Sequence, residues 1–344
     1  GALSRAGRGA INVAVLRAGV QTTVQDLGLH SLQRFGVPVS GAMDAYSLTV
    51  ANLLVGNQAA DAALEMTLDG ATLQFDGDAL IAIAGPDPRP LLGVQPLPAL
   101  RPLWVRSGAR VRCGIGRRGC RAYLAVAGGF DVPVVLASRA TYLRGGFGGL
   151  SGRALKQGDR LAVSAPQAVR FPGLRAQLDA SDSGFAAPHW SASAHPERLD
   201  RDPQRIRFVP GRHWEALDAE ARNRFLHAEY RVAAASDRMG YRLDGGTLAN
   251  AGAGSVPSES TAFGTIQLPP DGNPIVLMAE RQTTGGYPRI GEVAGADLAL
   301  LAQLRPGARL CFERIALGEA QRLWHQQAAA LAQIGASVAA NMAQ

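Results

Sequence analysis

Short apolar runs, separated by glycine, proline or Asp-Gly pairs, dominate the hydrophobic pattern of this chain. Runs of this kind, bounded by turn residues, are typical of β-strands rather than helices. With 41 glycines and 20 prolines, the pattern indicates a mainly β protein built as a barrel or a sandwich. The expected strands cover residues 11–16, 64–68, 73–75, 79–84, 103–106, 110–113, 122–126, 205–209, 229–234, 264–268, 275–278 and 310–315.

A few segments have helical spacing instead. Asp44 is a good N-cap for a helix over residues 45–55, and Gly56 marks its end. The polar segment 22–28, between the first strand and this helix, is expected to be a turn. Further short helices are expected over residues 214–225, 297–304 and 319–333.

Two short sequence motifs that each occur twice indicate two related barrel-like halves. Residues 155–161 and 304–310 share the pattern Leu-basic-x-Gly-x-Arg-Leu, which predicts a turn that feeds a strand. Gln-Thr-Thr occurs at both 21–23 and 282–284. The expected organisation is a disordered tail (1–10), an N-terminal β-barrel half (11–165), a linker or surface excursion (166–204), a C-terminal β-barrel half (205–316) and a C-terminal helix and tail (317–344).

The composition narrows the classes of function. A chain of 344 residues suggests two compact domains or one large all-β unit, and no apolar run approaches the ~20 residues that a membrane span needs. The net charge of +7 comes from scattered arginines, which does not predict nucleic-acid binding. Lys156 is the only lysine, so the chain has neither a P-loop nor a Met-Lys-Met site for biotin.

Cysteine and histidine residues give no sign of a metal site. The three cysteines are odd in number and unpatterned, which predicts reduced thiols in a cytoplasmic protein. Cys113 and Cys120 could meet across a hairpin, but no second pair of ligands accompanies them. None of the six histidines lies in a His-x-x-x-His pair or beside a nucleophile elbow.

Polar residues beside glycines, prolines and strand ends are the candidates for chemistry, because barrels place their sites there. The richest stretch is 281–291, which follows the apolar run at 275–278. Arginine binds planar anions with paired hydrogen bonds, and neutral amides and hydroxyls can hold an amide group. The stretch therefore predicts a site for a small ligand that contains an amide or a carboxylate. Glu65 lies in a strand of alternating apolar and polar residues, so the simpler prediction is that its side chain faces water.

Several motifs in order resemble one protein family. They are TTVQDLG (22–28), FGVPVSGAMD (35–44), ANLLVGN (51–57), SDRMGYRL (236–243), GTIQLPPDG (264–272) and QTTGGYP (282–288). Together they resemble the allophanate hydrolase subunit 2 family, also called the 5-oxoprolinase C-subunit, KipA or biotin-dependent carboxyltransferase family. The resemblance runs from about residue 13 to residue 315, and Glu280 stands where the family more usually has Asp.

The resemblance implies a cyclophilin-like β-barrel architecture and a partner, the subunit 1 protein or B-subunit (KipI-like). With a third, LamB/YcsF-like subunit, such a pair hydrolyses 5-oxo-L-proline to L-glutamate at the expense of ATP. In urea amidolyase, the equivalent fused domains move a carboxyl group from carboxybiotin to urea. A third kind of member is a regulator that acts by binding its KipI-like partner. No nucleic acid or membrane is expected among the partners.

We therefore expect a hydrolase subunit of an ATP-dependent 5-oxoprolinase, active only with its partners. The alternatives are a carboxyltransferase component and a non-catalytic regulator. ATP is expected at the level of the complex, and under the carboxyltransferase alternative carboxybiotin is on another chain. The expected catalytic or orienting carboxylates are Asp26, Asp44 and Asp237. The expected substrate-binding residues are Gln25, Arg34, Arg238, Arg281, Gln282, Thr283 and Tyr287.

Overall fold

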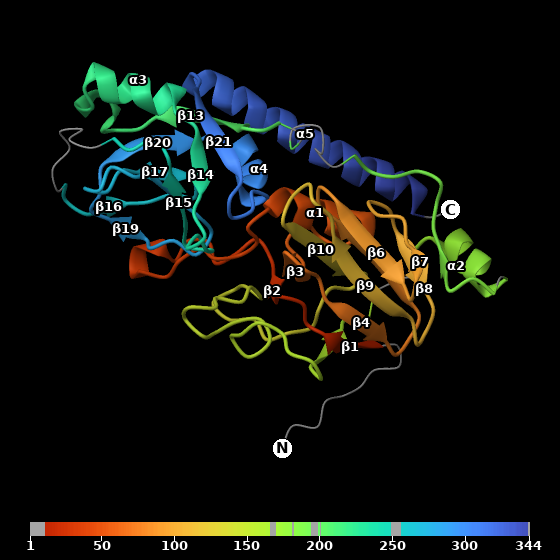
Figure 1. Ribbon diagram of the computed structural model, residues 1–344. Helices are drawn as coiled ribbons and strands as arrows, with labels where there is room; N and C mark the ends of the chain where they lie inside the picture. The colour runs from red at the N-terminus through yellow and green to blue at the C-terminus, as the bar shows by residue number, and fades with distance from the viewer. Residues whose placement is uncertain are drawn as a thin grey trace. The chain divides into compact units, whose positions relative to one another are not determined.

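The computed structural model describes residues 11–165, 170–180, 182–193, 199, 201–248 and 256–342 (Figure 1). Its residues form two compact units. Within the described ranges, the first unit takes residues 11–28, 45–193 and 331–342, and the second takes residues 29–44 and 199–330. The second unit thus includes an early segment, 29–44, that lies within the expected N-terminal half. The predicted tail at 1–10 lies outside the described residues.

Two six-stranded antiparallel sheets form the first unit (Figure 1). Their strand orders are β11-β1-β4-β9-β6-β7 and β12-β8-β5-β10-β3-β2. The elements are β1 (Ile11–Arg17), β2 (Gln21–Gln25), α1 (Ala45–Leu54), β3 (Ala63–Thr67), β4 (Thr72–Phe75), β5 (Ala79–Ala84), β6 (Pro88–Leu92), β7 (Gln95–Pro96), β8 (Leu103–Val105), β9 (Arg110–Ile115), β10 (Arg121–Val126), β11 (Arg160–Val163), α2 (Pro172–Asp179) and β12 (Phe185–Ala186).

Alternating side chains build the core of this unit. Val13 and Val15 of β1 belong to the same buried cluster as Leu64 and Met66 of β3, since residues two apart share one face of a strand. Helix α1 packs on β10, β5 and β3 and contributes no residue to that cluster. The helix begins directly after Asp44 and ends within one residue of the predicted end.

A closed barrel of seven strands forms the second unit, in the order β13-β20-β17-β18-β15-β14-β21, with a separate two-stranded ribbon, β16-β19 (Figure 1). This confirms the prediction of a mainly β protein with barrel architecture. The strands are β13 (Gln204–Pro210), β14 (Tyr230–Val232), β15 (Gly240–Asp244), β16 (Glu259–Ser260), β17 (Thr265–Gln267), β18 (Ile275–Leu277), β19 (Thr284–Gly285), β20 (Arg289–Val293) and β21 (Arg309–Arg314). The helices are η1 (Gln33–Phe35), η3 (Trp214–Ala216), α3 (Ala219–His227), η4 (Gly295–Asp297), α4 (Leu298–Ala302) and α5 (Leu317–Asn341), which continues beyond this unit.

Aromatic side chains fill the barrel's core. Phe225 of α3 stacks on Phe312 of β21 with ring centroids 4.7 Å apart. Phe208 of β13 lies edge-on to both rings, at 5.3 Å from Phe225 and 5.8 Å from Phe312. Trp214 closes the cluster at 5.4 Å from Phe208. Because rings packed in this way contribute more than their buried area alone, the cluster ties α3 to the barrel wall.

Two parts of the predicted secondary structure are wrong. The expected turn at 22–28 is a strand in its first part, because β2 pairs with β3 over residues 21–25. Its polar side chains are buried but hydrogen-bonded, as when Thr22 Oγ1 donates to the carbonyl of Ala18. The linker or surface excursion predicted at 166–204, of which residues 166–169, 181, 194–198 and 200 lie outside the described residues, is expected to be irregular but contains helix α2. This helix starts with a proline and buries Leu174 and Leu178, four residues apart.

The repeated Leu-basic-x-Gly-x-Arg-Leu pattern forms the same local structure in each unit. Gly158 N donates to Val15 O, and Val15 N donates to the next carbonyl, that of Asp159. In the second unit Gly307 and Ala308 make the equivalent pair of bonds with Val232. Both glycines have positive φ, at 91° and 85°, where a side chain would be strained. The predicted turns, each feeding a strand, are therefore confirmed.

The cysteines are reduced in this structure. Cys113 and Cys120 are buried and Cys311 is half-buried. No group of three or more histidine, cysteine, aspartate or glutamate side chains among the described residues could hold a metal ion. Across the same residues, none of the helices combines the length and the apolar character that crossing a membrane would require.

We expect Cys113 to resist thiol reagents at pH 8 in the folded protein. Desolvation raises the pKa of Cys113 to about 12, so almost none of it is thiolate at that pH. Because the folded pKa exceeds the unfolded value, this thiol's contribution to stability is fully present below about pH 8.5 and is lost as the pH rises toward 12. A time course with Ellman's reagent, with and without guanidinium chloride, measures this. Immediate reaction of all three native thiols would contradict the burial of Cys113.

Candidate functional site

Asp26, an expected catalytic residue in the first unit, has its carboxylate fixed by hydrogen bonds from neighbouring residues. Its carboxylate accepts hydrogen bonds from Gly28 N at 2.7 Å, Ser138 Oγ at 2.7 Å and Arg139 N at 2.6 Å. The neighbouring Gln25 donates through Nε2 to Thr23 Oγ1 and Thr141 O, while its Oε1 is buried without a partner among the described residues. The geometry gives Asp26 the role of a clamp between two loops.

Glu65 is buried, so the interpretation that it faces water is wrong. Its Oε2 accepts a hydrogen bond of 2.7 Å from the phenol of Tyr123, and Arg121 Nε lies 3.9 Å from its Oε1. The three side chains come from β3 and β10, which are neighbours in the sheet. A buried carboxylate is retained only when it is paired, and here the adjacent strand supplies the partners.

Three expected site residues of the second unit have structural partners. Asp44 accepts a hydrogen bond of 2.7 Å from Gln303 Nε2. The exposed Asp237 accepts from the backbone of Met239 and closes its own turn. Arg238 is buried against Glu280, with Nε 2.6 Å from the carboxylate, and its Nη2 donates to the carbonyl of Gly41.

The other expected binding residues lie on exposed loops or near them. Arg34 stacks its guanidinium 4.7 Å from the centroid of Phe35, on the surface. Gln282 and Tyr287 are exposed, and Thr283 is half-buried. Gln282 and Thr283 also serve the fold through their carbonyl groups, which accept hydrogen bonds from the hydroxyl and the amide of Thr261.

Arg281 differs from all of these because it is a buried cation that is bonded to no carboxylate among the described residues. It is 5% exposed, Nη1 is 3.5 Å from the carbonyl of Met278, and Nε has no acceptor among the described residues. Desolvation lowers the pKa of Arg281 to about 10, and the charge of Glu292 opposes this shift only in part. The guanidinium therefore stays protonated at neutral pH.

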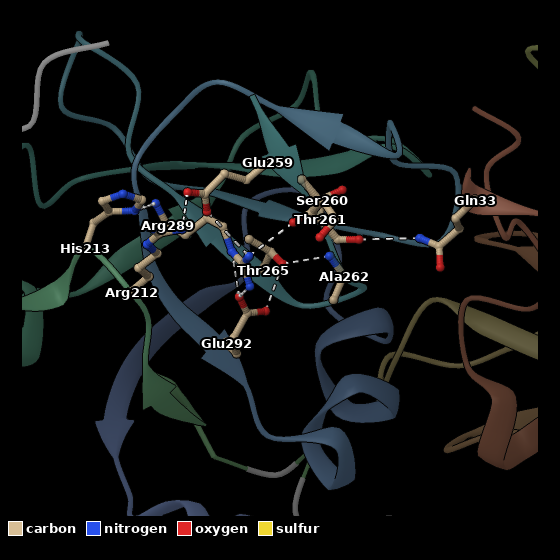
Figure 2. Close-up of polar contacts among 10 residues, drawn as sticks. All are labelled: Gln33, Arg212, His213, Glu259, Ser260, Thr261, Ala262, Thr265, Arg289 and Glu292. Atoms are coloured by element: carbon tan, nitrogen blue, oxygen red, sulfur yellow. Dashed lines mark hydrogen bonds and ion pairs between the residues drawn. The ribbon is translucent and has the colours of Figure 1, made fainter. Parts of the chain in front are cut away.

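Glu292 belongs to a polar network on the outer face of the barrel strands β17 and β20 (Figure 2). It accepts hydrogen bonds from Thr265 Oγ1 at 2.8 Å and Arg289 Nη2 at 2.6 Å. Figure 2 shows Arg289 between Glu292 and Glu259, whose carboxylate lies 3.8 Å from Arg289 Nη1. Glu259 also pairs with Arg212 at 2.6 Å. Both glutamates are therefore satisfied by arginines other than Arg281.

His213 joins this network through the backbone. Its Nδ1 accepts a hydrogen bond of 3.0 Å from Arg289 N, and its own backbone N–H donates to Arg289 O. Since Nδ1 is the acceptor, the ring proton of the neutral imidazole lies on Nε2. The histidine thus anchors the start of β20, the strand that carries Arg289 and Glu292.

Gln267 was not among the residues expected from the sequence. It lies on β17 two residues after Thr265, so both side chains leave the strand on the same face, opposite Ile266 in the core. It is 1% exposed, yet its Nε2 has no partner among the described residues. Its alternation with Ile266 was visible in the sequence, but its burial was not.

We use the name outer polar cluster for the residues that share this face or contact it. They are Thr261, Thr265, Gln267, Arg289, Glu292 and Glu259. Of the ten expected site residues, Arg281 lies within reach of the charge of Glu292, and Gln282 and Thr283 touch the cluster through Thr261. Gln25 and Asp26 lie in the other unit. The cluster contains an amide nitrogen, Gln267 Nε2, that has no partner among the described residues.

Comparisons with known proteins agree on one family. Residues 35–314 match the family model described as "Carboxyltransferase domain, subdomain A and B". The 5-oxoprolinase C-subunit of Escherichia coli (strain K12) is 36% identical over 315 residues, which cover 91% of this chain and 94% of that protein. Its counterpart from Haemophilus influenzae is 37% identical over 311 residues, covering 90% and 94%.

A comparison with solved structures also supports the fold. The K. lactis urea amidolyase superposes with a TM-score of 0.80 at 29% sequence identity. The match covers 97% of this chain and 20% of the urea amidolyase, so this chain spans about a fifth of that protein.

Proposed function

Because the chain belongs to the family of carboxyltransferase domains with subdomains A and B, we propose that it is the C-subunit of an ATP-dependent 5-oxoprolinase. The complex would hydrolyse 5-oxo-L-proline to L-glutamate. The observation that carries this proposal is the similarity, at 36% and 37% identity, to two proteins of that name over 94% of each. Those names imply partner subunits. We propose a KipI-like B-subunit and a LamB/YcsF-like third subunit.

The chemistry of the reaction is consistent with an enzyme whose functions are shared between several subunits. Resonance stabilises the lactam, so water attacks it slowly unless its oxygen is first made part of a leaving group, as phosphorylation by ATP would do. This chain does not fit a P-loop nucleotide site, since its single lysine, Lys156, lies in an exposed turn closed by Asp159. We therefore propose that ATP acts at the level of the complex, and that this chain has a share in holding the substrate.

A second candidate is carboxyl transfer from carboxybiotin to urea or a related acceptor. The similarity to the K. lactis urea amidolyase favours it, since it covers 97% of this chain. The single lysine, Lys156, is flanked by Leu155 and Gln157 rather than by the methionines of a biotin site, so the carboxybiotin would be carried by another chain. The two candidates differ in the acceptor they require, and an assay can separate them.

Assembly of the complex tests the proposal. We would co-express this chain with the KipI-like and LamB/YcsF-like proteins from the same genome and measure ATP-dependent release of glutamate from 5-oxo-L-proline. We expect release by the full complex and none when this chain is omitted. Turnover of urea and carboxybiotin instead would favour carboxyl transfer. Full release without this chain would favour a regulator that binds its partner.

A further inference from the structure

We propose that His213 is a pH-sensitive latch, which holds the loop 281–288 at the point where β20 begins and releases this end of the loop when mild acid protonates its ring. The proposal goes beyond the proposed function and does not depend on it. It rests on the hydrogen bonds that join His213 to Arg289, the first residue of β20, in the network of Figure 2.

His213 completes the edge of β20 where the neighbouring strand ends. Strand β13 pairs with β20 as far as Pro210, which lies opposite Gly291. Two residues earlier in β20, the partner of Arg289 is His213. Its backbone N–H donates to Arg289 O at 2.9 Å, and its Nδ1 accepts from Arg289 N at 3.0 Å. The imidazole thus takes the place of the carbonyl group that a neighbouring strand would provide.

An imidazole acceptor depends on pH, whereas a backbone carbonyl does not. Neutral imidazole has a lone pair on one ring nitrogen, but both nitrogens of the protonated ring carry hydrogen and neither can accept. Histidine is the side chain that ordinarily changes its charge between pH 5 and 8. In His213 the accepting nitrogen is Nδ1, so an added proton would point at the N–H of Arg289 and break the bond. The closed arrangement therefore needs neutral His213, and it is lost as the pH falls.

The charged groups around His213 are paired with one another. They are Arg212 on its own loop, Glu215 on η3, Glu259 on β16, and Arg289 and Glu292 on β20. Arg212 pairs with Glu259 at 2.6 Å, and Arg289 pairs with Glu292 at 2.6 Å. Glu215 pairs with Arg222 on α3. Among the described residues these carboxylates are bonded to arginines rather than to the His213 ring, so the bond from Arg289 N decides which form of the ring the closed state prefers.

The latch acts where the loop 281–288 joins the barrel. Arg289 follows the loop directly, and its Nη1 donates to Ser260 O of the β16-β19 ribbon at 3.1 Å. The other end of the loop follows Glu280, whose backbone N–H donates to the carbonyl of Arg238. One end is therefore held by an imidazole and the other by backbone atoms, which do not titrate. Acid should loosen the loop from the Arg289 side.

Hydrogen exchange of the Arg289 amide, followed by two-dimensional NMR on the purified full chain, tests the inference. The rates are expressed as protection factors, which removes the intrinsic dependence of exchange on pH. An imidazole in water is half protonated at about pH 6.5, so the protection factor in the unmodified chain should fall about tenfold between pH 7.5 and pH 5.5. A constant protection factor over this range would overturn the inference.

Two variants separate the proton from the contact. His213→Asn offers an amide oxygen in place of Nδ1 and takes up no proton, so protection should be high at both pH values. His213→Ala removes the acceptor, so protection should be low at both. His227→Asn, which removes an exposed histidine at the end of α3 in the same unit, is the matched control and should keep the tenfold response. A response that persists in both His213 variants would belong to other groups and would overturn the inference.

A measurement on the unmodified chain covers the case in which a variant does not fold. The ring nitrogen signals of His213 in ¹⁵N-labelled protein report which nitrogen carries a proton. We expect Nε2 alone to be protonated at pH 7.5, and protonation of Nδ1 to follow the same pH curve as the loss of Arg289 protection. Protonation of the ring with Arg289 protection intact would overturn the latch. Neither readout involves glutamate release or substrate binding, so the latch and the proposed function can fail separately.

Discussion

Replacing Arg238 by methionine is expected to lower the free energy of unfolding by about 3–5 kcal/mol, because the variant leaves the Glu280 carboxylate buried without its charged partner. The two side chains are 5% and 3% exposed, and they are joined at 2.6 Å. The variant also removes the donor to the carbonyl of Gly41. Urea denaturation followed by circular dichroism measures the loss.

The double variant Arg238→Met/Glu280→Leu separates structure from substrate binding. Because a buried ion pair can often be replaced by apolar side chains at little cost, we expect the double variant to regain much of the lost stability. If it also regains glutamate release in the complex, Arg238 is structural. Arg242→Met, at an exposed position of the same unit, is the matched control and should stay within about 0.5 kcal/mol of the unmodified chain. Equal stability of Arg238→Met and the unmodified chain would contradict the importance of the pair.

Arg238 also marks the limit of what the sequence could predict about the site. Arg34, Arg238 and Arg281 all lie beside glycine or strand ends, so residue type and position made them equivalent candidates. Their states differ because of partners far away in the chain. Glu280, which satisfies Arg238, is 42 residues from it, and no local pattern reports such a pairing.

The same reason explains the other differences at the site. Asp26 was expected to be catalytic or orienting from its place beside a glycine, and the sequence did not show that two of its partners come from a loop more than 100 residues later. Gln267 alternates with Ile266 and would face water in an isolated barrel. It is buried where Gly285, on the β16-β19 ribbon, lies against its amide. By contrast, α1 and the turns at Gly158 and Gly307 depend on local signals, and the sequence predicted them correctly.

The fold was more predictable than the site because it depends on repeated local patterns. Short apolar runs between glycines specify strands wherever they occur, and the motifs in order specify the family. Helix α2 was missed because its apolar side chains, Leu174 and Leu178, cover only two turns within a polar segment. Strand β2 was missed because its buried residues include Thr22, Thr23 and Gln25, whose polar side chains are not typical of a buried strand.

Phe208→Ala is expected to destabilise the protein by about 3–5 kcal/mol, the usual cost of removing a fully buried phenyl ring. Phe208 touches three other rings of the barrel's core, so the cavity cannot close without disturbing Trp214, Phe225 and Phe312. Its strand, β13, pairs with β20 at Phe208↔Val293 and Val209↔Glu292. The loss should therefore loosen β20 as well.

The matched control is Phe35→Ala, which removes the same ring from a position in the same unit that is 67% exposed. We expect it to change stability by less than about 0.5 kcal/mol, because little apolar area returns to water. Differential scanning calorimetry would be run on both variants. An unchanged thermal midpoint in Phe208→Ala would show that the aromatic cluster does not hold β13 against its neighbours.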